Sequence, residues 1–226
     1  KNIYVMFVSM ESILKYNDKN LHENLLKTIN YREKKGILPL YRAKQILTQV
    51  YKKFSLSFDS MTDLPKELRT ELNEKFKISS LKITKILESS DGETKKYLFE
   101  TDKKDFIEAV RIEHPNRSTV CISSMVGCPL GCAFCATASM KQRRNLDIDE
   151  IVSQILLLYT EKPFQNAVFM GMGEPLLNID NVFNVILLIS DEALMNFSPR
   201  RFTISTAGVI RGIEKLVSIN KKINLA

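Results

Sequence analysis

Hydrophobic residues in the first third of the chain recur every three or four positions, as on one face of an α-helix. Within 21–30 and 41–51 these residues are Leu21, Leu25, Leu26, Ile29, Ala43, Ile46, Leu47 and Val50. A third stripe consists of Leu64, Leu68, Leu72 and Phe76. Pro65 suits the first turn of that helix, and Thr62 or Asp63 can cap it. Residues 1–78 are therefore predicted to form a small helical module.

From residue 79 the spacing changes to alternation, which is typical of strands. Three strands are predicted, over 81–88, 96–101 and 106–112, and Asp91-Gly92 between the first two is a hairpin turn signal. Tyr97 and Phe99 share one face of the second strand. Residues 79–118 are thus predicted to be a short antiparallel β unit.

The third of these strands carries a carboxylate on a mostly apolar face. Phe106, Val110 and Ile112 lie on the same side as Glu108, where the pattern asks for a hydrophobic residue. A carboxylate among apolar neighbours has a raised pKa and can accept a proton near neutral pH. The alternative is an exposed glutamate on an edge strand, and the pattern alone favours that alternative.

Strands and helices alternate from residue 119 to the end. The predicted strands are 120–123, 166–170, 201–205 and one that opens at Ile223, and the predicted helices are 147–159, 182–190 and 210–218. Asp147 and Glu150 form a capping box for the first helix. Repeated βα units imply a parallel sheet closed into a full or partial barrel, with chemistry at the C-terminal strand ends. Residues 119–226 are predicted to be this α/β part.

Composition and charge indicate a globular protein with a basic N-terminal part. The 226 residues are 44% hydrophobic and 26% charged, as in globular proteins, and no apolar run approaches the ~20 residues of a membrane span. Residues 1–78 hold 15 Lys and Arg against 9 Asp and Glu, a net of +6 that accounts for nearly all of the chain's +7. A basic module can hold a phosphate backbone, although a solvated lysine-rich surface is the alternative.

Three of the four cysteines, Cys128, Cys132 and Cys135, have the spacing C-x3-C-x2-C. Three thiolates on a short loop can bind three irons of a [4Fe–4S] cluster. The fourth iron is then open to the amino and carboxylate groups of S-adenosylmethionine (SAM), which electron transfer cleaves to a radical. Zinc with Cys121 as a fourth ligand, or inert core cysteines, are the alternatives. The clustering favours a reducing compartment, with the cytoplasm or an organelle matrix as the default.

Polar residues follow two of the predicted parallel strands. Gly173 and Glu174 come after the strand ending at Met170, where glycine allows close approach to a ligand and the carboxylate can bind the amino group of SAM. Ser205 follows the next strand, where a hydroxyl can bond the ribose or carboxylate of the cofactor. Phe134 can pack on the adenine, with core packing as the alternative for a lone aromatic.

Taken together, these residues resemble the RlmN/Cfr family of radical-SAM RNA methyltransferases. The matching segments are 61–65, 121–128, 132–137, 144–146, 169–178 and 198–208. Residues 1–35 carry no part of the match, and 139–142 replace a stretch in which the family commonly has Gly-Phe. Proline after Glu174 resembles the branch that methylates C2 of adenine, because the C8 enzymes have alanine there.

The resemblance implies a function and a role for each matching residue. Cys128, Cys132 and Cys135 would bind the cluster, and Gly173, Glu174 and Ser205 would contact SAM. Glu108 matches the proton acceptor of the family, and Cys121 matches a position implicated in resolving a protein–RNA crosslink. The implied substrates are adenosine in 23S rRNA, methylated at C2, and the tRNA adenosine beside the anticodon.

The family transfers the methyl group through a C-terminal cysteine. This chain stops at Ala226, before the position of that cysteine, so we expect it to be the N-terminal part of a longer protein and to be inactive alone. The expected partners are the RNA substrates and a flavodoxin-like electron donor, with no membrane association and a monomeric state. The other functions left open are a different radical-SAM enzyme, such as an activase or methylthiotransferase, and a zinc-containing RNA-binding module.

Overall fold

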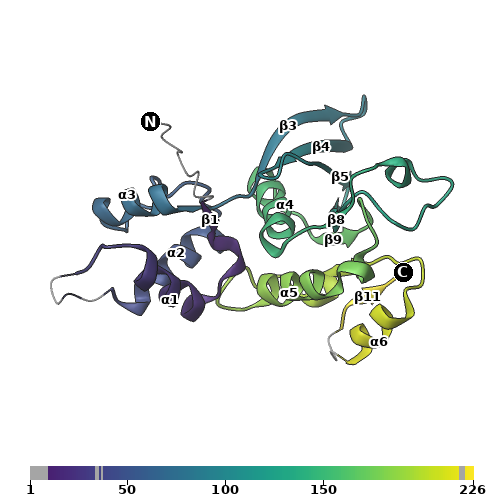
Figure 1. The fold of residues 1–226 in the computed structure, drawn as a ribbon. Helices are drawn as coiled ribbons and strands as arrows, with labels where there is room; N and C mark the ends of the chain where they lie inside the picture. The colour runs from purple at the N-terminus through teal and green to yellow at the C-terminus, as the bar shows by residue number, and fades with distance from the viewer. Residues whose placement is uncertain (1–9, 34–35, 37, 219–221) are drawn as a thin grey trace, which may run out of the picture. The chain divides into compact units, whose positions relative to one another are not determined.

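The computed structural model describes residues 10–33, 36, 38–218 and 222–226. The chain divides between Ile78 and Ser79 into two compact units, which Figure 1 shows as the purple-to-blue and the teal-to-yellow parts of the ribbon. The division lies where the helical module was expected to end, and the roles given to residues 1–78, 79–118 and 119–226 remain predictions. Within the described ranges, no helix is long and apolar enough to cross a membrane.

The first unit contains the three expected helices, α1 (Asp18–Thr28), α2 (Leu40–Tyr51) and α3 (Lys66–Lys75). Their apolar stripes form the core, because all but one of the residues assigned to these stripes are buried. Leu26 is the exception, with 39% of its surface exposed. Two short parallel strands, β1 (Glu11–Ser12) and β2 (Phe76–Lys77), and the 3-10 turn η1 (Ile13–Lys15) complete the unit.

The expected cap of α3 is wrong. The N-cap position is Pro65, which has no side-chain hydrogen bond. Thr62 and Asp63 belong instead to the preceding turn, in which the N–H of Leu64 donates to the carbonyl of Met61 over 2.9 Å. Neither residue occupies the N-cap position from which a side chain caps a helix.

The second unit is built on one seven-stranded sheet, in the order β11-β10-β9-β6-β5-β4-β3. The strands are β3 (Leu81–Glu88), β4 (Thr94–Thr101), β5 (Phe106–His114), β6 (Arg117–Cys121), β9 (Asn166–Phe169), β10 (Phe202–Ile204) and β11 (Asn224–Leu225). Neighbours from β3 to β6 are antiparallel, and neighbours from β6 to β11 are parallel. The antiparallel and the parallel segments expected from the sequence thus share a single sheet.

Helices cover one face of this sheet. The helix α4 (Ile148–Glu161) connects β6 to β9, α5 (Ile179–Ser190) connects β9 to β10, and α6 (Ile210–Ser218) connects β10 to β11. The guanidinium of Arg111, from the buried side of β5, donates to the carbonyls of Leu158 and Lys162 at the end of α4. The ring of Phe202 on β10 packs edge-on against Phe197 after α5, with centroids 5.2 Å apart. The predicted βα alternation is confirmed.

The other face of the sheet is the more exposed one. It carries Lys96, Glu108, Val110, Cys121, Val168 and Thr203, which adjoin one another across β4, β5, β6, β9 and β10. All six are only partly buried, whereas their neighbours along the strands, such as Ile107, Ala109 and Ala167, are buried. We call this surface the open face.

Two strand predictions need correction. The strand expected over 120–123 is β6, which ends at Cys121, because the N–H of Ser123 donates to the side chain of Gln154 over 2.8 Å and so leaves the ladder. Glu108 does not lie on the core face, and it does not lie on an edge strand either, because β5 is paired on both sides. It lies in the middle of the open face.

Candidate active site

The three clustered cysteines lie on a loop whose two ends meet. Strand β7 (Met125–Val126) leads into it and β8 (Arg144–Asn145) leads out, and the two pair antiparallel. We call residues 127–143 the cysteine loop. Gly127 and Gly131 have φ angles of 65° and 67°, a conformation that favours glycine. At the start of the loop there is no room for a side chain, since a Cβ on Gly127 would lie 2.4 Å from the carbonyl oxygen of Gln142.

A pocket of about 360 Å³ opens beside this loop. Its lining comes from three places: the cysteine loop, the end of β9 and the segment after β10. The lining residues are Cys128, Leu130, Cys132, Phe134, Cys135, Phe169, Met170, Gly171, Gly173, Glu174, Ser205, Thr206 and Ala207. The structure thus brings together, at the C-terminal ends of parallel strands, every residue that the sequence assigned to the cluster or to SAM.

Glu174 is the buried charge of the pocket, with 4% of its surface exposed. One carboxylate oxygen accepts hydrogen bonds from the hydroxyl of Thr206 over 2.7 Å and the N–H of Leu176 over 3.0 Å. The other accepts from the N–H of Ala207 over 2.8 Å. Glu174 therefore ties the segment after β9 to the segment after β10, and it retains acceptor capacity because a carboxylate has about four acceptor sites.

The cysteines differ in acidity. Hydrogen bonds from the N–H and the hydroxyl of Thr137 lower the pKa of the Cys135 thiol. Burial raises the pKa of the Cys121 thiol, and a hydrogen bond from the N–H of Met170 offsets only part of that effect. The environment thus favours thiolate, the metal-binding form, at Cys135 and thiol at Cys121.

The lining residues fit a [4Fe–4S] cluster held by three thiolates. In a cubane cluster each cysteine binds a different iron, so the sulfurs surround a site and need not meet at one point. Among the described residues, no three His, Cys, Asp or Glu side chains converge as the ligands of a single ion do. Cys121 lies on β6 and is not among the described lining residues, so it adds no fourth ligand to the pocket.

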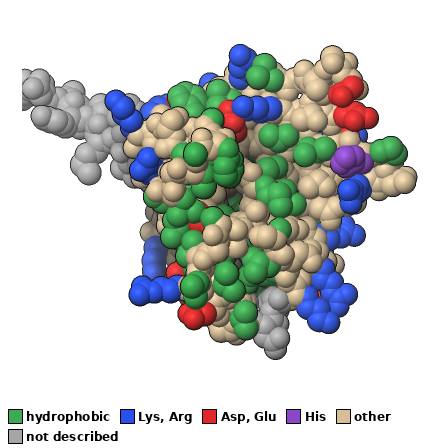
Figure 2. Space-filling view, turned by 90° about the vertical axis from the view of Figure 1, so that its right-hand side faces the viewer, with side chains coloured by type: hydrophobic (Ala, Val, Ile, Leu, Met, Phe, Trp, Pro, Cys, Tyr) green, Lys and Arg blue, Asp and Glu red, His purple; other side chains and the backbone are tan. Residues whose placement is uncertain are grey.

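Phe134 and Ser205 both line the pocket. The ring of Phe134 is not packed in the core, because 94% of the residue is exposed, and that alternative is wrong. Leu130 and Met170 are also exposed, at 41% and 50%. Figure 2 shows hydrophobic side chains gathered on one face of the molecule, with lysine and arginine side chains around them.

Glu108 and Cys121 lie outside the pocket lining but close together on the open face. Val110, two residues after Glu108 on β5, pairs directly with Cys121 on β6. Lys96 on β4 holds the carboxylate of Glu108 in an ion pair of 2.7 Å, and 41% of the Glu108 side chain is exposed. Glu108 is thus an accessible group beside a lysine rather than a carboxylate in an apolar environment.

The residues that hold these segments in place were not foreseen. The hydroxyl of Ser123 donates to the carbonyl of Glu108 over 2.6 Å and accepts from the N–H of Met172 over 2.8 Å. The side-chain amide of Gln154, fully buried on α4, exchanges hydrogen bonds with both the N–H and the carbonyl of Ser123. A glutamine on the apolar stripe of α4 was the signal in the sequence.

Gly171 and Gly173 have a packing role that differs from the expected one. A Cβ on Gly171 would lie 2.8 Å from the backbone of Ile122, and one on Gly173 would lie 2.4 Å from the Cβ of Met125. The two glycines therefore allow the segment after β9 to approach the segment after β6. The close approach that they permit is between two parts of the protein.

Comparisons with known proteins define the class. Residues 122–225 match the model of the radical SAM superfamily, and residues 16–78 match the N-terminal domain of ribosomal RNA large subunit methyltransferases. A crystal structure of a radical SAM methyltransferase from Sphaerobacter thermophilus superposes with a TM-score of 0.85 at 34% identity, over 95% of this chain and 62% of that one. This is a radical SAM fold, and the predicted α/β partial barrel is confirmed.

Curated relatives define the family. A probable dual-specificity RNA methyltransferase RlmN from Dictyoglomus thermophilum is 46% identical over 193 residues, which are 83% of this chain and 55% of the relative. The dual-specificity RNA methyltransferase RlmN from Geobacter sulfurreducens is 44% identical over 188 residues, 82% of this chain and 52% of the relative. The chain belongs to the RlmN family, and it spans about half the length of these relatives. Membership implies a [4Fe–4S] cluster and SAM as cofactors.

Proposed function

We propose that this chain forms the cluster-binding and SAM-binding part of an RNA methyltransferase that acts on C2 of adenosine. The proposed substrates are 23S rRNA and the tRNA adenosine beside the anticodon. The observation that carries the proposal is the pocket that the three cysteines line together with Gly173, Glu174 and Ser205. The names of the RlmN relatives support the substrate class, and proline after Glu174 supports C2 rather than C8.

Each lining residue has a proposed task. Cys128, Cys132 and Cys135 would hold the cluster, which together with SAM would supply a radical able to activate a methyl group. Glu174 offers its remaining acceptor sites to the amino group of SAM, while its bonds to Thr206 and Ala207 fix its orientation. Ser205 offers a hydroxyl to the ribose or carboxylate, and the exposed ring of Phe134 offers a stacking surface for the adenine.

Glu108 is proposed as the proton acceptor, with Lys96 holding its carboxylate in place on the open face. Cys121 lies one strand away and is proposed to take part in resolving a protein–RNA crosslink. The raised pKa of this partly buried thiol suits a group that must stay unreactive until it is deprotonated. Both residues lie on the face that the helices leave uncovered.

The proposed partners follow from charge and chemistry. Residues 1–78, with a net charge of +6, are proposed to contact the RNA backbone. A flavodoxin-like protein is proposed to supply the electron, and the protein is proposed to act as a monomer in the cytoplasm. Methyl transfer is proposed to go through a methyl-carrying cysteine other than the four cysteines of this sequence.

The first test is anaerobic reconstitution of the chain with iron and sulfide. The expected product is brown, with broad visible absorbance and about four irons per chain, as a cubane cluster requires. Cys128→Ala, Cys132→Ala and Cys135→Ala should each lose most of the iron, because each removes one of three ligands. Cys121→Ala is the matched control and should keep the cluster, because its side chain does not line the pocket.

A colourless chain that binds one zinc and needs Cys121 would contradict the proposal and favour a zinc-containing module. If the cluster forms as expected, the substrate is tested with the full-length protein and a 23S rRNA fragment or tRNA. Methylated adenosine is then located by mass spectrometry. Modification at a position other than C2, or of another class of substrate, would favour a different radical SAM activity.

A further inference from the structure

Arg144 lies at the end of the cysteine loop, where its guanidinium joins three elements of the second unit. We propose that Arg144 is a positioning residue for the cluster: clamped between Asp105 and Glu150, it fixes the cysteine loop against the β4–β5 turn and the first turn of α4. The inference rests on the proposed function, because it concerns the loop that is proposed to carry the cluster.

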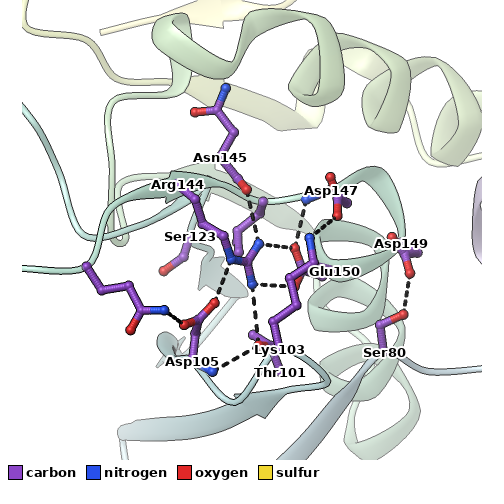
Figure 3. A network of polar contacts seen from close by, with 12 residues as sticks. Ser80, Thr101, Lys103, Asp105, Ser123, Arg144, Asn145, Asp147, Asp149 and Glu150 are labelled. Atoms are coloured by element: carbon purple, nitrogen blue, oxygen red, sulfur yellow. Dashed lines mark hydrogen bonds and ion pairs between the residues drawn. The ribbon is translucent and has the colours of Figure 1, made fainter. Parts of the chain in front are cut away.

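All five N–H donors of the guanidinium are used (Figure 3). Nε donates to Asp105 over 2.5 Å, and the two terminal nitrogens donate to the two carboxylate oxygens of Glu150, each over 2.7 Å. The remaining N–H groups donate to the carbonyl of Asn145 over 3.1 Å and the hydroxyl of Thr101 over 3.4 Å. Such a fork fixes direction as well as distance, which a point charge does not.

We call the two ion pairs of Arg144, with Asp105 and with Glu150, the clamp, and both of its carboxylates are buried. The side chains of Asp105 and Glu150 are 1% and 4% exposed, and that of Arg144 is 21% exposed. Burial alone would lower the pKa of Arg144, but hydrogen bonds and charge from Glu150 and Asp105 raise it above its ordinary value. Removing the guanidinium would therefore leave two buried carboxylates without the cation that both contact.

Neighbouring residues hold the same end of the loop. The side-chain amide of Gln142 donates to the second carboxylate oxygen of Asp105. The guanidinium of Arg143 turns back and donates to the carbonyls of Ala138 and Met140, over 3.1 and 3.2 Å. Gln142 and Arg144 thus both bond Asp105, while Arg143 bonds the backbone of the cysteine loop itself. Gln142 belongs to the stretch that differs from the common family pattern.

The position of Asp105 extends the effect beyond the loop. Asp105 directly precedes β5, the strand that carries Glu108 on the open face. Glu150 is the third residue of α4, and its carboxylate also accepts the N–H of Asp147 over 2.8 Å. One guanidinium therefore sets the cysteine loop relative to the strand of the proposed proton acceptor and to the helix behind it. Replacing a residue that hydrogen-bonds a metal ligand commonly changes metal affinity about 10- to 100-fold, and Arg144 is proposed to act on the ligands through the loop that carries them.

The test compares Arg144→Gln and Arg144→Lys with Arg111→Gln in the 226-residue chain. Arg111 is a matched control, because it is also a buried arginine of the second unit and also bonds α4. Its contacts there are the carbonyls of Leu158 and Lys162 at the opposite end of that helix, and it also pairs with Glu113 on its own strand. After reconstitution, iron release to a chelator is followed at one temperature well below the unfolding midpoint of each variant.

Arg144→Gln should release iron about 10- to 100-fold faster than the unaltered chain. Arg144→Lys should rescue only part of this loss, because an ammonium cannot reproduce the fork. Arg111→Gln should lower the unfolding temperature and leave the release rate within about twofold of the unaltered chain, well below the roughly 10- to 100-fold change expected for Arg144→Gln. Unchanged release from Arg144→Gln, or equally fast release from Arg111→Gln, would overturn the proposal.

If the unaltered chain takes up no cluster, the proposed function fails, and the clamp is still tested on the metal-free chain. Limited proteolysis should then cleave 128–141 faster in Arg144→Gln than in the unaltered chain and in Arg111→Gln. Equal cleavage in all three chains would show that Arg144 does not hold the cysteine loop.

Discussion

The four cysteines differ at the level of single residues. Cys121 sits on a strand at the centre of the sheet, where burial raises the pKa of its thiol. Cys135 sits at the end of the cysteine-rich run, where the N–H and hydroxyl of Thr137 lower the pKa of its thiol. Because the thiolate is the nucleophile, the two residues should also differ in reactivity.

In the reduced, metal-free chain at about pH 8, iodoacetamide should therefore label Cys135 well before Cys121. The sign follows from the pKa values: at a pH below both, the thiol with the lowered pKa has the larger thiolate fraction. The difference should shrink as the pH rises above both values. Peptide mass spectrometry of samples quenched at intervals measures the rates, and the urea-unfolded chain is the control. Equal rates in the folded chain would contradict the prediction.

Arg111 explains why the face of β5 was assigned wrongly from the sequence. The residue pattern of β5 placed Phe106, Val110 and Ile112 on the core side, but the buried side of the strand carries Ile107, Ala109 and Arg111. A buried arginine is possible because the carbonyls at the end of α4 accept its N–H groups and Phe164 packs 5.8 Å from it. Local alternation cannot reveal such distant partners.

Among the elements, the segments after β6 and β9 fit together only through glycine. Gly173 has a φ of 98°, and an added Cβ would lie 2.4 Å from Met125. Gly208, after β10, has a φ of 96°, but an added Cβ would meet nothing within 4 Å. An alanine would therefore strain the backbone at both positions, but it would overlap with a neighbouring residue only at position 173.

Gly173→Ala should lower the free energy of unfolding by about 2–4 kcal/mol, because strain and overpacking add. Gly208→Ala should cost only about 1 kcal/mol, from strain alone. Urea denaturation of the apo chain measures both. A loss at Gly208→Ala equal to that at Gly173→Ala would show that Met125 yields to the added methyl group.

Features that depend on a local sequence pattern could be predicted, whereas hydrogen bonds between elements far apart in the sequence could not. The stripes of α2 and α4, the Asp147–Glu150 cap and the cysteine spacing are all local in sequence. By contrast, Arg144 lies 39 residues from Asp105, and Thr206 lies 32 residues from Glu174. The lining of the pocket could be predicted because strand ends in a parallel sheet converge, but the residues that fix it required the fold.

For the whole molecule, positive charge is concentrated in one unit. Residues 1–78 carry a net charge of +6, and the remaining residues are close to balance. Lys27, Lys52 and Lys66 are exposed on this unit. Lysines that neutralise RNA phosphates release counterions, so their contribution appears as a salt dependence of binding.

Reversing these three charges to glutamate should weaken binding of an rRNA fragment and reduce the slope of log K against log salt by about 2 to 3. Filter binding or fluorescence anisotropy at several salt concentrations measures the slope. The control reverses Lys82, Lys85 and Arg117, which are exposed on the second unit, and should change the slope less. Equal effects of the two triple variants would indicate attraction by net charge alone.

The meeting of β7 and β8 has a consequence for evolution. Because the ladder and the contact of Gly127 with Gln142 close the base of the cysteine loop, insertions near its tip need not disturb the sheet. Doubling the length of a flexible loop costs only about 0.6 kcal/mol of closure entropy. Residues 138–141 can therefore drift in sequence and length, while substitutions at Gly127, Thr137 and Arg144 face much stronger purifying selection.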